Sequence, residues 1–68
     1  MTGFYKFLDS KRIQWGRKSD DKIYVWSSGD NRLEQMNIEK AANLCGATVL
    51  EQRFDKQCGK TYIVIKHN

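Results

Sequence analysis

The chain has no proline, two cysteines and one histidine among its 68 residues. The absence of proline argues against a disordered, proline-rich linker and favours a chain built of regular elements. Two cysteines are too few for the disulfide scaffold of a small secreted domain. We therefore expect Cys45 and Cys58 to be reduced thiols, although a bridge between them stays open. The N-terminus lacks the basic stretch and apolar run of a signal peptide, and together these absences predict a cytoplasmic protein.

Long apolar runs and clustered metal ligands are also missing. No segment approaches the ~20 apolar residues that span a bilayer, so we expect no membrane partner. A structural zinc site needs four cysteine or histidine ligands in paired spacings, whereas Cys45, Cys58 and His67 stand alone. No glycine-rich loop of the kind that cradles phosphates is present. The sequence predicts neither a metal nor a cofactor.

Catalytic groupings are equally scarce. Nucleophilic catalysis needs a base within reach of the nucleophile, and the single histidine, His67, is the penultimate residue. Cys58 lies near Lys56 and Lys60, and nearby cations can activate a thiol. No base accompanies it, and we expect an exposed, inert thiol. The adjacent Asp20 and Asp21 are typical of a solvated turn. We expect no catalytic residues and a protein that is not an enzyme.

Size and charge set the remaining limits. We expect residues 1–68 to form one domain, and a domain of this size buries only about 60% of the surface of its unfolded chain. The net charge is +4. Residues 1–22 and 51–68 are basic, and residues 23–50 are slightly acidic. A basic surface suits an anionic partner such as nucleic acid or an acidic protein patch.

The segment from Asn37 to Gly46 has the pattern of a short helix. Asn37 is a good N-cap, and Gly46 can adopt the left-handed conformation that ends a helix. Between them, apolar residues recur with the spacing of one helical face. We expect a helix over Ile38–Cys45. Arg32–Met36 suits either a third strand or a first helical turn that runs into this helix, and we favour a brief extended piece.

Residues 2–11 are ambiguous between helix and strand. Phe4, Phe7 and Leu8 have the spacing of a helical face, and Thr2 can cap it. The five consecutive residues from Phe4 to Leu8 also suit an extended strand. We favour a short helix here.

Two alternating patterns predict β-hairpins. The first joins strands near 12–15 and 22–27 through a loop at 16–21, and the second joins strands near 48–54 and 61–66 through a loop at 55–60. The expected fold is α+β, a small antiparallel sheet of two hairpins with one or two short helices packed on one face. The residues expected to be buried together are Ile38, Leu44, Leu50, Ile63 and Ile65.

A basic segment with interleaved aromatic residues is the strongest functional signal. Its cations can meet phosphates while an exposed ring stacks on a base. The candidate nucleic-acid-binding residues are Lys11, Arg12, Trp15, Arg17, Lys18 and Trp26. Alternatively, Ile13 and Trp15 belong to the core and the charges line a solvated hairpin.

Tyr24 and Trp26 sharpen this choice. If Ile23 and Val25 face the core, the two aromatic residues face away from it. They then either pack beneath the first helix or mark a contact surface.

The first functional hypothesis is a small, non-enzymatic nucleic-acid-binding module. The alternative is a protein-binding regulator or inhibitor, of the kind phages encode, that docks on the acidic surface of a larger nucleic-acid-processing enzyme or complex. The sequence predicts no particular oligomeric state.

Overall fold

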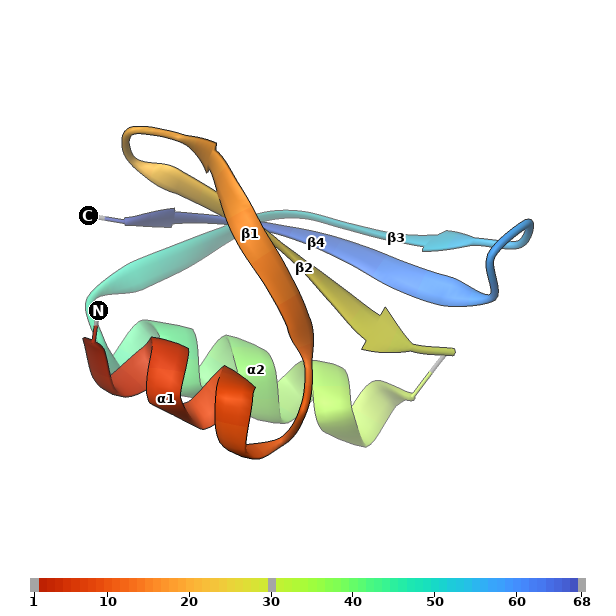
Figure 1. Ribbon diagram of the computed structural model, residues 1–68, viewed down its shortest axis with the longest axis horizontal. Coiled ribbons are helices and arrows are strands. Elements are labelled where there is room, and N and C mark those ends of the chain that lie inside the picture. Colours follow the sequence, from red (N-terminus) through yellow and green to blue (C-terminus); the bar gives the residue numbers. More distant parts are fainter. Residues whose placement is uncertain (1, 30, 68) are drawn as a thin grey trace.

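The computed structural model describes residues 2–29 and 31–67, which form an antiparallel sheet and two helices (Figure 1). The elements in chain order are α1 Thr2–Ser10, β1 Gln14–Ser19, β2 Lys22–Ser28, α2 Arg32–Leu44, β3 Ala47–Asp55 and β4 Lys60–His67. The predicted α+β fold is confirmed, with both helices on the same side of the sheet.

The four strands lie in the order β1-β2-β4-β3, and all neighbours are antiparallel. The two hairpins therefore meet through β2 and β4, which are far apart in the sequence. Strands β1 and β3 form the sheet edges, and each contains an irregularity in its register, after Arg17 and after Val49. Such bulges disrupt the edge ladder and discourage pairing with another chain.

Helix α1 resolves the ambiguity over residues 2–11 in favour of the helix. Phe4 and Leu8, one turn apart, are completely buried, because they face the sheet together. The chain then turns sharply, with Arg12 in the left-handed region (φ 58°) and the Ile13 amide donating to the Leu8 carbonyl at 2.9 Å. Residues 12 and 13 are thus turn and connection, and the expected strand at 12–15 begins at Gln14.

The first hairpin is longer than predicted, since the expected loop at 16–21 is mostly strand. Gly16 pairs with Tyr24, Arg17 with Ile23 and Ser19 with Lys22, which leaves Asp20 and Asp21 as the turn. Ser19 Oγ and Lys22 Nζ donate to Asp21 Oδ1 at 3.1 and 3.4 Å. These two hydrogen bonds, the one from Ser19 foremost, lower the pKa of Asp21 below its usual value.

Helix α2 begins at Arg32, six residues before the predicted start at Ile38, so the extended piece expected over Arg32–Met36 is wrong. Asn31 is the N-cap, and its side-chain oxygen accepts from the Glu34 amide at 3.1 Å. The Glu34 carboxylate in turn accepts from Ser27 Oγ at 2.5 Å and from the Ser28 amide at 3.2 Å. This link between helix and strand favours Asn31 over Asn37, which lies exposed within the helix.

The end of α2 and the second hairpin agree with the sequence pattern. Cys45 is the C-cap, and Gly46 has the predicted left-handed conformation (φ 76°). Strands β3 and β4 cover the expected ranges with a few added residues, and Gly59 at their turn also has a positive φ (69°).

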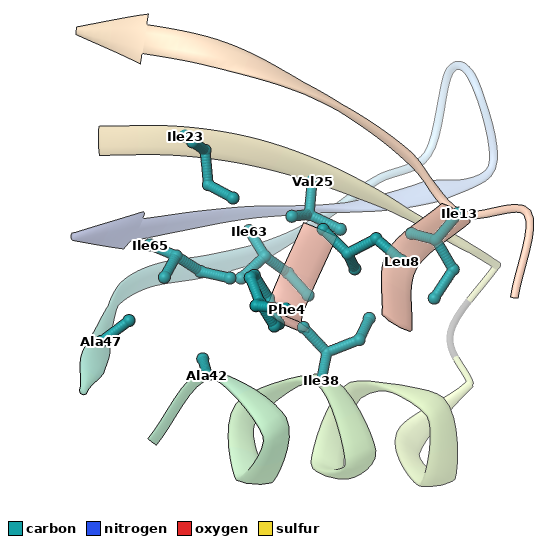
Figure 2. Close-up of a cluster of buried hydrophobic side chains, with 10 residues drawn as sticks. All are labelled: Phe4, Leu8, Ile13, Ile23, Val25, Ile38, Ala42, Ala47, Ile63 and Ile65. Carbon is teal, nitrogen blue, oxygen red and sulfur yellow. The ribbon is translucent and has the colours of Figure 1, made fainter. Parts of the chain in front are cut away.

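The core lies between the sheet and the two helices, where ten buried side chains converge (Figure 2). Ile38, Ile63 and Ile65 are buried there, as predicted.

The prediction is wrong for Leu44 and Leu50, which are 80% and 51% exposed. Leu44 lies two positions, about 200°, beyond the buried Ala42 on the helix. Leu50 is left without a ladder partner by the irregularity between Val49 and Glu51, so strand alternation does not hold there.

Within the described part of the chain, neither helix has the length and apolarity to cross a membrane. Helix α2, the longer one, has 13 residues.

Candidate nucleic-acid interface

Three aromatic side chains lie together on the face of the sheet turned away from the helices, here called the open face. Tyr24 and Trp26 alternate along β2 with the buried Ile23 and Val25, so they point to the opposite side. Trp26 pairs with Tyr62 of β4. The Tyr62 ring centroid lies 4.8 Å from that of Trp26 and 6.3 Å from that of Tyr24. All three residues are half-buried, which leaves part of each ring in contact with solvent.

Two cations lie over the central ring of this cluster. Lys18 Nζ is 5.8 Å from the Tyr62 ring centroid and donates to the Tyr62 hydroxyl at 3.3 Å. Arg53 Cζ is 5.1 Å from the same centroid, and its Nε donates to Glu51 Oε2 at 2.8 Å. Lys18 comes from the β1 bulge and Arg53 from β3, so cations from both edge strands meet at Tyr62.

The rest of the open face is also predominantly basic. Ladder register places Lys22 and Lys66 opposite each other on this face, and Lys60 lies two residues from Tyr62. Glu51 and Asp55 share the face from β3. Lys22 is offset by its ion pair with Asp21, 3.4 Å between Nζ and Oδ1. The strands thus place five cationic side chains and two carboxylates on the open face, so its net charge is positive.

Gly16 makes room for the Tyr24 ring. It is the cross-strand partner of Tyr24, and a Cβ atom built at Gly16 would overlap the end of that ring. A side chain at position 16 would push the ring away from its present place. The position of the Tyr24 ring in the aromatic cluster thus depends on a glycine in β1.

Of the six residues predicted from sequence, Lys18 and Trp26 lie together on the open face. Trp15 does not join them. Its ring stacks on Tyr5 of α1, with centroids 4.5 Å apart and planes 3° apart, and its Nε1 donates to Asp9 Oδ1 at 2.9 Å. Trp15 packs against the core, as the alternative interpretation of the hairpin held.

The other three predicted residues are exposed but lie elsewhere. Lys11 and Arg12 occupy the connection between α1 and β1. Arg17 pairs with the core residue Ile23, which places it on the helix side of the sheet. The six candidates therefore do not form one surface.

Sequence reasoning missed Tyr62 and Arg53. Tyr62 alternates along β4 with the buried Thr61 and Ile63, so it lies on the opposite face of the strand. Its contact with Trp26 depends on the pairing of β2 with β4, and its contact with Arg53 on the pairing of β3 with β4. The first pairing joins separate hairpins and has no local sequence signal.

Groups suited to metal or thiol chemistry are sparse in residues 2–29 and 31–67. No set of three or more histidine, cysteine, aspartate or glutamate side chains there is placed to hold a metal ion. Cys45 is half-buried and Cys58 exposed, and both are free thiols.

Comparison of the chain with protein-family models, with curated proteins and with solved structures found no match.

Proposed function

We propose that this protein binds single-stranded nucleic acid on the open face of its sheet. The observation that carries the proposal is the contact cluster of Tyr24, Trp26 and Tyr62, with Lys18 and Arg53 over its central ring. Aromatic rings offer stacking surfaces that any base can use, and neighbouring cations attract the phosphates. The open face combines both features within a few ångströms.

The charge layout supports an anionic partner. Lys22 and Lys66 lie directly opposite each other on β2 and β4. Like charges in that position destabilise a sheet, and a phosphate near them would relieve the repulsion. Asp21 offsets Lys22 in part. An anionic ligand on the open face is therefore favoured electrostatically.

The same geometry favours single strands over a duplex. Bases of a duplex are already stacked on one another, so the three rings have no base face to contact. Duplex DNA would meet only the cations, whose attraction depends strongly on salt. We propose that the protein acts in the cytoplasm by binding, without catalysis.

The test is a titration of labelled single-stranded DNA, single-stranded RNA and duplex DNA against wild type and Trp26→Ala. Loss of one stacking ring should weaken single-strand binding by about 1–3 kcal/mol and leave duplex binding nearly unchanged. Tyr5→Ala is the matched control, because it removes a half-buried ring from the helix side of the sheet. Circular dichroism checks that both variants are folded at the assay temperature.

Failure of the wild type to bind any of the three probes at low salt would refute the proposal. Equal weakening by Trp26→Ala and Tyr5→Ala would also count against it, since stacking on the open face predicts a difference between them.

A protein-docking role is the second candidate, and one observation favours it. Leu33, Met36 and Leu44 of α2 are 69%, 68% and 80% exposed, and they lie along one side of the helix around Lys40. Exposed apolar residues gathered in this way are typical of protein interaction sites. The partner would be a larger protein with an apolar patch bordered by acidic residues.

Leu33→Gln combined with Leu44→Gln tests this second role. Both residues are exposed, so the fold should persist, and a protein retained by the wild type from nuclease-treated lysate should be lost. Retention of the same protein by the double variant would exclude the α2 surface.

A further inference from the structure

A groove of about 430 Å³ separates the N-terminal half of α2 from the last part of β3. Its walls include Arg32, Met36 and Glu39 from the helix and Gln52, Arg53 and Phe54 from the strand. This volume lies within the range of small-molecule sites. The groove adjoins the outer edge of the sheet, since β3 is an edge strand.

A hydrogen-bonded network forms the floor of the groove. Gln35 is buried, and its Nε2 donates to Thr61 Oγ1 at 3.0 Å. Gln52 Nε2 donates to Gln35 Oε1 at 2.5 Å, and Thr61 Oγ1 donates to the Gly29 carbonyl at 2.7 Å. The bond to Gln35 uses one N–H of Gln52, whose amide also carries a second N–H and a carbonyl oxygen. The network therefore holds in place an amide that can pair with the polar edge of a ligand.

Apolar walls stand beside this amide. Phe54 is 46% exposed although it pairs with the buried Thr61, and Met36 across the groove is 68% exposed. A phenyl ring offers a stacking surface, and a methionine sulfur makes favourable contacts with aromatic rings. A flat, heteroaromatic ligand with a hydrogen-bonding edge fits this combination.

Arg32 places a positive charge at the rim of the groove. Arg53 also lines the groove and is ion-paired with Glu51, and the carboxylate among the lining residues is Glu39. Arg53 also lies over Tyr62 on the open face, so this residue is shared by the two surfaces. A nucleic-acid strand that leaves the open face near Tyr62 would pass Arg53 and reach the groove around the edge of β3.

We infer that this groove is a nucleotide subsite that holds one further base of a strand bound on the open face, an inference that rests on the proposed function. The base lies between Phe54 and Met36 and pairs with the Gln52 amide. Its phosphate contacts Arg53 or Arg32. The protein thereby gains affinity for nucleic-acid strands that are long enough to extend from the open face around β3 into the groove.

The experiment compares a thymidine dinucleotide with an octamer, on wild type and on Phe54→Ala. Leu50→Ala is the control, because Leu50 is a similarly exposed apolar residue of the same strand outside the groove. We expect Phe54→Ala to weaken octamer binding roughly 5- to 150-fold, the equivalent of one lost stacking contact. Dinucleotide binding should not change, and Leu50→Ala should behave as wild type with both probes.

Arg32→Ala provides a second measure that does not touch the sheet. Arg32 is exposed on α2. Its loss should reduce the salt dependence of octamer binding by about one counterion and leave that of the dinucleotide unchanged.

The possible outcomes separate this inference from the proposed function. If Phe54→Ala binds the octamer as tightly as wild type does, or binds both probes more weakly by the same factor, the subsite is overturned and the open-face proposal stands. Failure of the wild type to bind either probe overturns both. Selective loss of octamer affinity, together with the reduced salt dependence of Arg32→Ala, supports the subsite.

Discussion

Ile38 and Leu44 lie six residues apart on α2 and have opposite environments. Ile38 is fully buried against the sheet, whereas Leu44 is 80% exposed on the outer side of the helix. Both are large aliphatic residues, so their chemistry alone does not distinguish them. The difference comes from helix rotation, since six residues correspond to 600°, which leaves Leu44 about 120° away from Ile38.

This contrast predicts unequal stability effects. Ile38→Ala should lower the free energy of unfolding by about 2–5 kcal/mol, because it leaves a cavity in the core. Leu44→Ala should change it by less than about 0.5 kcal/mol, as is usual at an exposed position. Chemical denaturation of both variants measures the difference. A loss of several kcal/mol in Leu44→Ala would indicate that this side chain is covered in solution.

At the scale of elements, hydrogen bonds between the first turn of α2 and the end of β2 determine where α2 begins. Asn31 followed by Glu34 has the spacing of a capping box, and this local signal could have been found in the sequence. The competing cap at Asn37 has the same residue type. The contacts of Glu34 with Ser27 and Ser28 favour the earlier start, and those contacts depend on the tertiary approach of helix to strand.

Replacing each asparagine in turn tests the helix start. Asn31→Ala should cost about 0.5–2 kcal/mol of stability through loss of the N-cap. Asn37→Ala should be neutral or slightly stabilising, because alanine has a higher helix propensity at an exposed interior position. Thermal unfolding followed by circular dichroism compares them. The reverse order of effects would mean that the helix begins near residue 38.

The turn of the first hairpin predicts a dependence on pH. The pKa of Asp21 is lowered on folding, so its contribution to stability is present above the pKa of the unfolded chain. That contribution is lost as the pH falls through the lower, folded value. Asp21→Asn should therefore be less stable than wild type at neutral pH and should approach it at about pH 2.

Unfolding free energies at both pH values measure this effect. Asp20→Asn is the control, because the hydrogen bonds from Ser19 and Lys22 are made to Asp21. An equal loss at both pH values would show that the carboxylate charge is not the cause.

At the scale of the whole molecule, the sheet separates two surfaces of different character. The helix side contains the core, and the open face contains the aromatic cluster with its cations. Arg17 and Lys18 are adjacent in the sequence, yet β1 directs them to opposite sides. The net charge of the chain does not show how its cations are distributed between the two sides of the sheet.

The division predicts that two equal changes of charge have unequal effects. Lys18→Glu should weaken binding of single-stranded nucleic acid strongly at low salt and less at high salt, because it acts at the open face. Arg17→Glu changes the net charge by the same amount on the helix side and should have a much smaller effect. Titrations at two salt concentrations compare the variants. Equal losses would indicate attraction by overall charge, without a defined site.

The sequence by itself determined the α+β class, the second hairpin, the end of α2 before Gly46 and the placement of Tyr24 and Trp26 on the strand face opposite Ile23 and Val25. Each of these depends on residues close together in the chain, such as an alternating strand or a glycine with positive φ. Only the tertiary structure decided the exposure of Leu44 and Leu50, the stacking of Trp15 on Tyr5 and the contact of Trp26 with Tyr62. These features depend on helix rotation, a strand bulge and the pairing of β2 with β4. They arise from packing between segments distant in sequence, and local patterns do not encode that packing.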